Sequence, residues 1–208
     1  YSRLYRQIRE TTKLPESIAS ADPTLPTTKI ISGAQTGVDQ IGLEVGKELG
    51  IETGGTATPG FYTEKGKDIS LAEKYGVEEI TKELQAGKKG REFYLPRTEE
   101  NAKNSDGTVY FATDADSAGR IATKRYADKH NKPFLLNPTA KELSQWLIDN
   151  NIKTLNVAGN RASKLTTQQQ TNIKNILIEA LKAPAEVVTP PKKPVAEGIV
   201  FTPPGKAK

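Results

Sequence analysis

The spacing of apolar residues changes near residue 32, and the change predicts a strand, a turn and then a helix. Ile30 and Ile31 are β-branched and apolar, which is typical of the end of a buried strand. The residues from Ser32 to Gly37 are small and polar, as expected of a tight turn. Beyond residue 38, apolar side chains recur every fourth position: Ile41, Val45 and Leu49. This spacing places them on one face of a helix.

Strand-like apolar runs and helical stripes alternate along most of the chain. Strands are expected at 29–31, from residue 51, at 92–96, at 109–111, at 133–137 and at 153–159. Helices are expected at 38–49, 71–75, 77–84, 97–104, 117–130, 140–150 and 167–182. The alternation predicts an α/β fold with a doubly wound, mainly parallel sheet and helices on both faces.

The composition changes at both ends of the alternating region and divides the chain into three parts. Residues 1–28 contain three prolines and are expected to form an N-terminal arm or linker. Residues 183–208 are rich in Pro and Lys and are expected to form an extended tail. The expected folded domain is 29–182. Each arm is a plain linker in one interpretation and a docking segment for protein partners in the other.

The turn after the first strand has the composition of an anion-binding turn. Gly33 and Gly37 can take positive φ or admit a ligand close to the backbone. The turn leads into a predicted helix N-terminus, where backbone N–H groups favour an anion such as a phosphate. Gln35, Thr36 and Asp39 add hydrogen-bonding groups at the same place. The alternative is an ordinary strand-to-helix turn without a ligand.

Later turns repeat this chemistry. Gly54 and Gly55 follow the second extended segment, and Gly159 with Arg161 follows the strand at 153–159. In doubly wound sheets, ligands lie at the carboxyl ends of the strands. We therefore expect four turns to meet at one edge of the sheet, those at Gly33, Gly54, Asp106 and Gly159.

Arg97 is a further candidate for contact with an anion. Arg97 and Asn101 are four residues apart in a predicted helix and would share one face. A guanidinium suits bidentate recognition of a phosphate or carboxylate. The alternative is that Arg97 pairs with a local acid such as Glu100.

Composition and charge narrow the chemistry. The 208 residues include no Cys, which excludes disulfides, Cys-based zinc sites and Cys nucleophiles. The single His argues against a His-rich metal site or a Ser-His-Asp triad, and no metal site is predicted. No apolar run approaches the roughly 20 residues of a membrane span, and a cytoplasmic location is expected. The net charge of +5 favours an anionic small molecule, with nucleic acid a weaker candidate.

Four segments, taken in order, resemble a known family. They are SGAQTGVDQ at 32–40, TGG at 53–55, YLPRTEENAKNSDGT at 94–108 and LNVAGNRAS at 155–163. Together they are similar to the putative molybdenum carrier family, the circularly permuted YpsA-like branch of the SLOG superfamily. The resemblance covers about 29–182. It implies a Rossmann-like domain that binds an anionic or nucleotide-derived ligand, and for some members the molybdenum cofactor, which is a phosphorylated pterin.

The resemblance also implies a set of ligand-contacting positions. They are Gly33, Gln35, Thr36, Gly37, Asp39, Gly54, Gly55, Arg97, Asn101, Ser105, Asp106, Thr108, Gly159 and Arg161. Two positions in the first turn depart from the family pattern. Ala34 stands where a second Gly is usual, and Gln40 stands where Arg is usual.

Three functions remain open at this point. The first is binding of a phosphorylated small molecule, such as a nucleotide, an NAD-derived species or a pterin cofactor. The second is hydrolysis of an N-glycosidic or phosphate bond in such a ligand, with Asp39 or Asp106 as the acid or base. The third is a non-catalytic assembly module that docks partners through its arms. The oligomeric state is open, and a homo-oligomer is among the alternatives.

Overall fold

A parallel sheet forms the centre of the computed structural model, which describes residues 25–114 and 116–182. Its strands are β1 (Lys29–Ile31), β2 (Glu52–Ala57), β5 (Val77–Glu79), β6 (Gly107–Phe111), β7 (Phe134–Leu136) and β8 (Thr154–Gly159). They lie in the order β5-β2-β1-β8-β6-β7, and every neighbouring pair is parallel. Most of the two predicted arms, at 1–24 and 183–208, lies outside the described residues.

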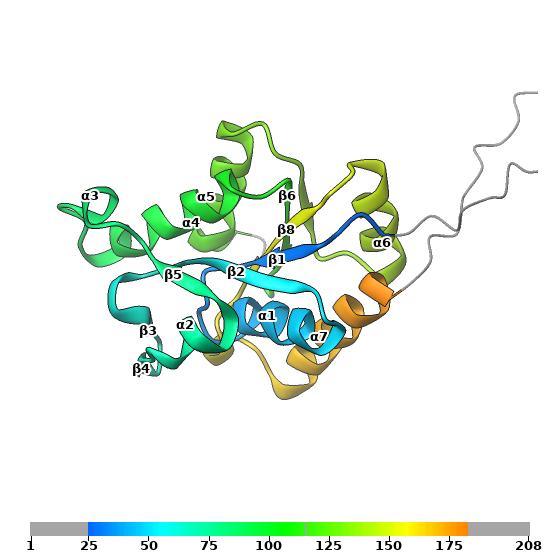
Figure 1. Cartoon of the computed structure of the whole chain (residues 1–208), viewed down its shortest axis with the longest axis horizontal. Helices are drawn as coiled ribbons and strands as arrows, with labels where there is room; N and C mark the ends of the chain where they lie inside the picture. The colour runs from blue at the N-terminus through cyan, green and yellow to red at the C-terminus, as the bar shows by residue number, and fades with distance from the viewer. Residues whose placement is uncertain (1–24, 115, 183–208) are drawn as a thin grey trace, which may run out of the picture.

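Helices cover both faces of the sheet (Figure 1). One face carries α1 (Val38–Leu49), α2 (Ser70–Tyr75), α6 (Ala140–Asp149) and α7 (Thr167–Lys182). The other carries α4 (Leu95–Lys103) and α5 (Ala118–Lys129), which pack against each other. The predicted α/β, doubly wound arrangement is therefore confirmed, with a Rossmann-like sheet that is parallel throughout.

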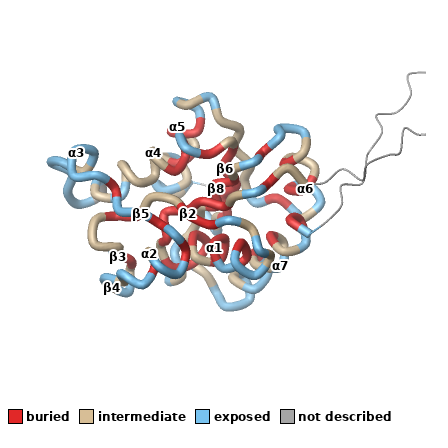
Figure 2. Tube along the Cα trace, viewed as in Figure 1, coloured by how far each residue is buried: buried red, intermediate tan, exposed pale blue. Residues whose placement is uncertain are grey.

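The main core lies beneath the sheet, on the face of α1, α6 and α7. Leu155 and Val157 of β8 point to this face and are fully buried. They pack with Leu143 and Leu147 of α6 and Leu177 of α7. Figure 2 shows the buried positions concentrated along the central strands and the inner sides of these helices. The apolar stripes of these helices are buried here because removing them from water is the main favourable term in folding.

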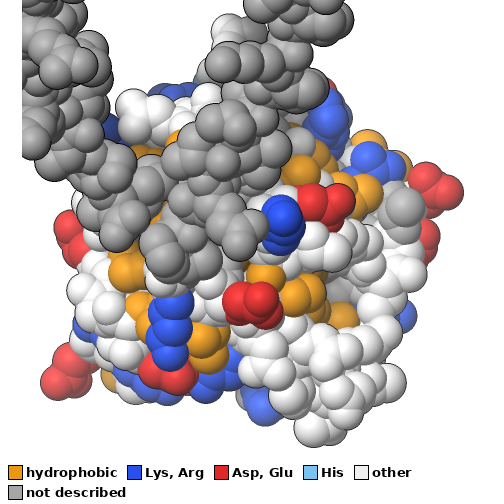
Figure 3. Space-filling view, turned by 90° about the vertical axis from the view of Figure 1, so that its right-hand side faces the viewer, with side chains coloured by type: hydrophobic (Ala, Val, Ile, Leu, Met, Phe, Trp, Pro, Cys, Tyr) orange, Lys and Arg blue, Asp and Glu red, His pale blue; other side chains and the backbone are white. Residues whose placement is uncertain are grey.

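Short elements connect the main layers. A small hairpin of β3 (Tyr62–Thr63) and β4 (Gly66–Lys67) follows β2 and η1 (Pro59–Phe61). Helix α3 (Lys82–Gln85) and the 3₁₀ turn η2 (Gly90–Tyr94) lead into α4, and η3 (Ala162–Lys164) separates β8 from α7. Among the coloured side chains of Figure 3, basic and acidic groups are interspersed rather than separated by sign.

Two predicted elements between 77 and 96 are wrong. A helix was expected over 77–84, but Val77 begins β5, an edge strand parallel to β2, and the helix α3 starts only at Lys82. Gly76 ends α2 with φ of 68°, and this turn returns the chain to the sheet edge. Residues 92–96 were expected to be extended, but they belong to η2 and the start of α4. Pro96 is compatible with helix there because a first-turn N–H needs no partner within the helix.

Close packing of α1 on β8 predicts that an alanine in α1 destabilises the fold. A Cβ added at Gly42 would lie 2.6 Å from two carbons of Val157, so Gly42→Ala forces the helix away from the sheet. We expect the free energy of unfolding to fall by about 1–3 kcal/mol in urea titrations, although Ala is the better helix former. Lys47→Ala, at an exposed position of α1, is the control and is expected to change stability little. Equal stability of both variants would contradict the close contact.

Candidate functional site

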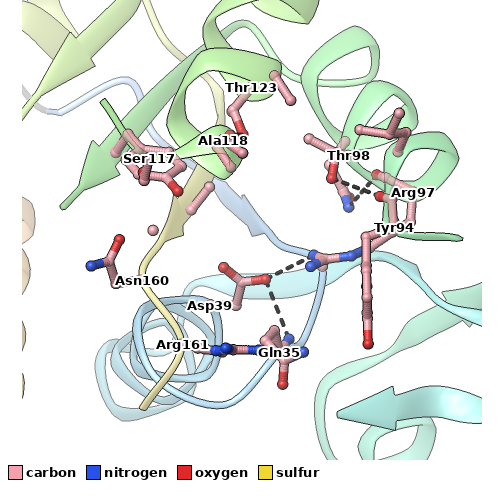
Figure 4. A pocket seen from close by; sticks show the side chains of 18 of the residues that line it. Gln35, Asp39, Tyr94, Arg97, Thr98, Ser117, Ala118, Thr123, Asn160 and Arg161 are labelled. Carbon is pink, nitrogen blue, oxygen red and sulfur yellow. Dashed lines mark hydrogen bonds and ion pairs between the residues drawn. The ribbon is translucent and has the colours of Figure 1, made fainter. Parts of the chain in front are cut away.

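A cavity of about 880 Å³ opens at the carboxyl edge of the sheet, between the tips of β1 and β8 and the helices α4 and α5. Figure 4 shows Tyr94, Arg97 and Thr98 on one side and Ser117, Ala118 and Thr123 on another. Gln35, Asp39, Asn160 and Arg161 form the part nearest the strand tips. The cavity thus joins segments that are more than 120 residues apart in the sequence.

A buried ion pair borders the cavity. Arg97 Nη1 of α4 lies 2.9 Å from Asp39 Oδ2 in the first turn of α1, and the side chains are 14% and 5% exposed. Gly33 permits this contact, because a Cβ there would lie 1.3 Å from Arg97 Nη1. Glu100, the alternative partner considered for Arg97, pairs with Lys103 instead. Arg97 Nε is buried and has no hydrogen-bond partner.

The charge on Asp39 depends on opposing effects. Burial raises the pKa of Asp39, and the Arg97 guanidinium with the N–H groups of Gln35 and Gly159 opposes that rise. Burial and the nearby Asp39 charge also raise the pKa of Tyr110 to about 12. The Tyr110 phenol therefore stays protonated at neutral pH and can donate a hydrogen bond at the cavity wall. The hydroxyl lies close to α5, since a Cβ at Gly119 would be 3.1 Å from it.

The two turns predicted to bind an anion contact each other through backbone hydrogen bonds. The Val38 N–H donates to the Asn160 carbonyl over 3.1 Å, and the Ala162 N–H donates to the Thr36 carbonyl over 3.1 Å. Gly37 has φ of 92°, and a Cβ there would lie 2.5 Å from the Asn160 oxygen. Gly37 thus allows one turn to approach the other. The prediction that these two turns converge is confirmed. The Val38 N–H at the α1 N-terminus, however, already donates to the protein backbone.

A carboxylate of the chain itself lies where the two turns meet. Glu64, between β3 and β4, accepts from Thr36 Oγ1 at 2.6 Å, and from Ser163 N at 3.0 Å and Oγ at 2.5 Å. Its Oε2 is also 3.5 Å from Arg161 Nε, while its N–H donates to Gln35 Oε1 over 2.8 Å. We call these five residues the Glu64 clasp. The anion that the turns after β1 and β8 bind in this structure is therefore the Glu64 carboxylate of the same chain.

The start of α5 differs from the start of α1. Ser117 caps α5 by accepting a hydrogen bond from the Arg120 N–H. The next two residues, Ala118 and Gly119, occupy first-turn positions whose N–H groups have no partner within a helix. Both residues line the cavity and are exposed. This edge of the cavity therefore has the positive end of a helix dipole.

Three predicted site residues lie away from this edge. Asp106 comes before β6, not after a strand, and its carboxylate accepts from the N–H groups of Lys153 and Thr154 at 3.1 and 2.8 Å. Asp106 therefore joins β6 to β8 at the amino edge, and the expected convergence of this turn is wrong. Ser105 is buried and donates to the Ala102 carbonyl. Thr108 lies inside β6 and is fully buried.

Gly54 and Gly55 lie within β2, so the prediction that they form a turn after a strand is wrong. Gly55 has φ of 122°, and a Cβ there would lie 2.9 Å from Asn101 Oδ1 and closer still to the Ser32 backbone. Asn101 Oδ1 accepts from the Thr56 N–H, and its Nδ2 donates to the Thr56 and Arg97 carbonyls. Asn101 borders the cavity, but these bonds commit its amide to holding α4 against β2.

The remaining predicted residues border the cavity or the Glu64 clasp, whereas several lining residues were not predicted. Gly159 and Arg161 line the cavity, and Thr36 belongs to the clasp. The lining residues that the sequence did not indicate include Tyr94, Ala118, Asn156 and Lys164. For Asn156 a signal existed, because it is a polar residue between Leu155 and Val157 in a strand expected to be buried.

Comparisons with known proteins identify one family. The model of the circularly permutated YpsA SLOG family matches residues 30–181. Among solved structures, the chain is similar to that of a protein named putative molybdenum carrier protein, from Syntrophus aciditrophicus. The two share 28% identity with a TM-score of 0.63, over 78% of this chain and 99% of the other. No curated protein matches the chain.

The described residues contain neither a cluster of metal ligands nor a membrane-spanning helix. Within 25–114 and 116–182, no group of three or more His, Asp or Glu side chains is arranged to hold a metal ion. Over the same ranges, no helix has the length and apolar character needed to cross a membrane.

The Glu64 clasp predicts a pH-dependent contribution to stability. Burial alone would raise the pKa of Glu64, but hydrogen bonds from Ser163 and Thr36 and the charge of Arg161 together lower it below its ordinary value of 4.5. A carboxyl whose pKa is lower in the folded protein stabilises the fold above pH 4.5, and this stabilisation is lost as the pH falls further. Glu64→Gln should therefore lower stability by about 1–2 kcal/mol at neutral pH and reduce the acid dependence.

Urea unfolding between pH 7 and 3 measures this effect. Glu83→Gln, an exposed position on α3, is the matched control and should follow the wild-type pH profile. If Glu64→Gln also followed the wild-type profile, Glu64 would contribute nothing through its charge.

Proposed function

The chain belongs to the circularly permutated YpsA SLOG family, and from this we propose that it binds a phosphorylated small molecule of nucleotide size in the cavity between α4 and α5. The ligand would be a nucleotide, an NAD-derived species or a phosphorylated pterin. The volume of about 880 Å³ supports this proposal, because small-molecule sites usually measure about 300–1,000 Å³.

The observation that carries the proposal is the N-terminus of α5 at the cavity edge. Ala118 and Gly119 bring two first-turn N–H groups to a concave, accessible surface. Lys164 of η3 lines the same cavity, and so does Arg161, whose Nε also lies 3.5 Å from Glu64 Oε2. Backbone donors, a helix dipole and nearby cations together favour a phosphate group. We therefore assign the phosphate to α5 rather than to the turns of the Glu64 clasp, which already hold a carboxylate.

The buried groups farther inside the cavity would contact the rest of the ligand. Arg97 Nε is a donor without a partner, and the Tyr110 hydroxyl stays protonated at neutral pH. Asp39 neutralises the Arg97 charge, so the inner cavity carries little net charge. A neutral ring or sugar suits this environment better than a second phosphate, because burying an unpaired charge is costly.

The solved relative is named a putative molybdenum carrier protein, so the fit of this cavity to a molybdenum cofactor needs a physical test. The phosphate of such a pterin matches the α5 N-terminus with Arg161 and Lys164. The described residues provide no cluster of metal ligands. The cofactor would thus be held through its phosphate and pterin, and the metal chemistry would belong to the cofactor itself.

The arrangement favours binding over hydrolysis. Of the two carboxylates considered as acid or base, only Asp39 borders the cavity, and it is committed to Arg97 and the Gln35 N–H. We place ligand binding in 29–182 as one domain. The segments 1–28 and 183–208 would be arms available to protein partners.

Ala118→Pro tests the proposal by removing one N–H from the α5 N-terminus. Proline is tolerated at the first helical position, and Ser117 already has an extended ψ of 138°. We expect the affinity for a phosphorylated probe to fall about 10-fold or more, because a hydrogen bond to a charged group contributes about 1.5–3 kcal/mol. Calorimetry with 5′-AMP, 5′-GMP, NAD⁺ and neopterin monophosphate would measure this.

Ala140→Pro is the matched control. It places the same substitution at the first position of α6, after Thr139, whose ψ is 166°. This variant should bind as the wild type does. Binding that Ala118→Pro leaves unchanged would exclude α5 as the phosphate site, and failure of all four probes to bind the wild type would refute the proposal.

A further inference from the structure

The sheet is unusually polar on the face that lies under α4 and α5. A parallel sheet covered on both faces normally carries apolar side chains on both. On β8, Leu155 and Val157 meet this expectation on the α1 face. On the opposite face β8 carries Asn156, and its neighbour in the register on β6 is Thr108. β8 is one of the two central strands of the sheet and β6 is its neighbour, so both polar positions lie on inner strands rather than at an edge.

Asn156 has an oxygen without a hydrogen-bond partner. Its Nδ2 donates to Thr108 Oγ1 over 3.1 Å, but its Oδ1 has no partner. The residue is only 2% exposed. A buried acceptor without a partner costs about 1–3 kcal/mol, so such groups are rare unless something else satisfies them. Asn156 lines the cavity, so its amide borders the space that a bound ligand would fill.

The cavity wall near Asn156 consists largely of residues with small side chains. Ala158 lies two residues nearer the carboxyl end of β8 and therefore points to the same face. Opposite the strand, α5 contributes Ala118, Gly119 and Ala122 to the lining. Tyr110 of β6 pairs with Ala158 in the register and borders the same space. Short side chains on two walls and an aromatic ring on a third fit a flat group.

We propose that Asn156 lies at the bottom of an inner subsite, which recognises a planar heteroaromatic ring through an exocyclic amine. The amine donates to Asn156 Oδ1, and Thr108 fixes the orientation of the amide by accepting from its Nδ2. This inference rests on the proposed function, and it adds the chemical class of the ligand's non-phosphate end. The phosphate binds at the α5 N-terminus, and the ring extends along Ala158 to the sheet.

Pairs of mononucleotides that differ only by one amine test the subsite in the wild-type protein. 5′-GMP and 5′-IMP differ by the 2-amine, and 5′-AMP and purine riboside 5′-monophosphate differ by the 6-amine. We expect loss of the amine to weaken binding about 10- to 100-fold in at least one pair, measured by calorimetry. Equal affinities within both pairs would overturn the subsite while leaving the proposed function intact. If none of the four nucleotides binds, and NAD⁺ and neopterin monophosphate do not bind either, the proposed function fails and this inference fails with it.

Asn156→Leu provides the second measurement, because it removes the amide and keeps the number and branching of the side-chain heavy atoms. Amine discrimination should disappear in this variant, while the amine-free member of the pair keeps its affinity within about threefold. Ser144→Ala, which removes a buried polar group from α6 outside the cavity, is the control and should discriminate as the wild type does. Discrimination that persists in Asn156→Leu would assign the amine to another residue.

The same ring edge occurs in purines and pterins, and competition separates the two sources. Guanine and pterin both contain a 2-aminopyrimidin-4-one ring and present the same edge of it. Stronger displacement of bound 5′-GMP by neopterin than by guanosine would assign the subsite to a pterin, and the reverse would assign it to a purine. In both cases the stronger compound should no longer displace 5′-GMP preferentially from Asn156→Leu. A preference that persists in this variant would contradict the inference.

Discussion

The contact between the turns that follow β1 and β8 determines where the other groups of the site lie. Backbone hydrogen bonds join Val38 to Asn160 and Ala162 to Thr36, and Glu64 holds the outer side of this junction. The junction fixes the start of α1, and with it Asp39, at the base of the cavity. Asp39 in turn orients Arg97 of α4. One edge of the cavity is thus attached to the sheet through a short series of direct contacts.

These contacts also distribute charge within the site. The two most evident cations, Arg97 and Arg161, each have an acidic partner from the chain, Asp39 and Glu64. The start of α1, which resembles an anion site in sequence, is occupied by protein groups. At the start of α5, Ser117 caps the helix and Asp116 Oδ1 lies 3.7 Å from Arg120 Nη2. The N–H groups of Ala118 and Gly119 add the positive end of the α5 dipole to this edge of the cavity.

Local patterns predicted the layers of this fold well, but they predicted the partners of polar side chains poorly. The stripes of α1 and α7 and the apolar run of β6 are properties of neighbouring residues, so periodicity found them. Asp106 was placed at the wrong edge because its turn precedes a strand, a distinction that depends on an exact strand boundary. Glu64 was missed because its partner Ser163 is 99 residues away.

The two departures from the family pattern in the first turn contact each other. Ala34 replaces the usual Gly but keeps a positive φ of 57°, and Gln40 Nε2 donates to the Ala34 carbonyl.

The position of β8 has a consequence for biosynthesis. Among the described residues it is the last strand in sequence, yet it lies between β1 and β6, which have no direct pairing with each other. While the chain emerges from a ribosome, β5-β2-β1 and β6-β7 can form only as two separate ribbons. Insertion of β8 joins them and at the same moment supplies Asn156, Gly159 and Arg161. A nascent chain therefore completes its sheet and the wall of the cavity in one late step, after all the other described strands have been synthesised.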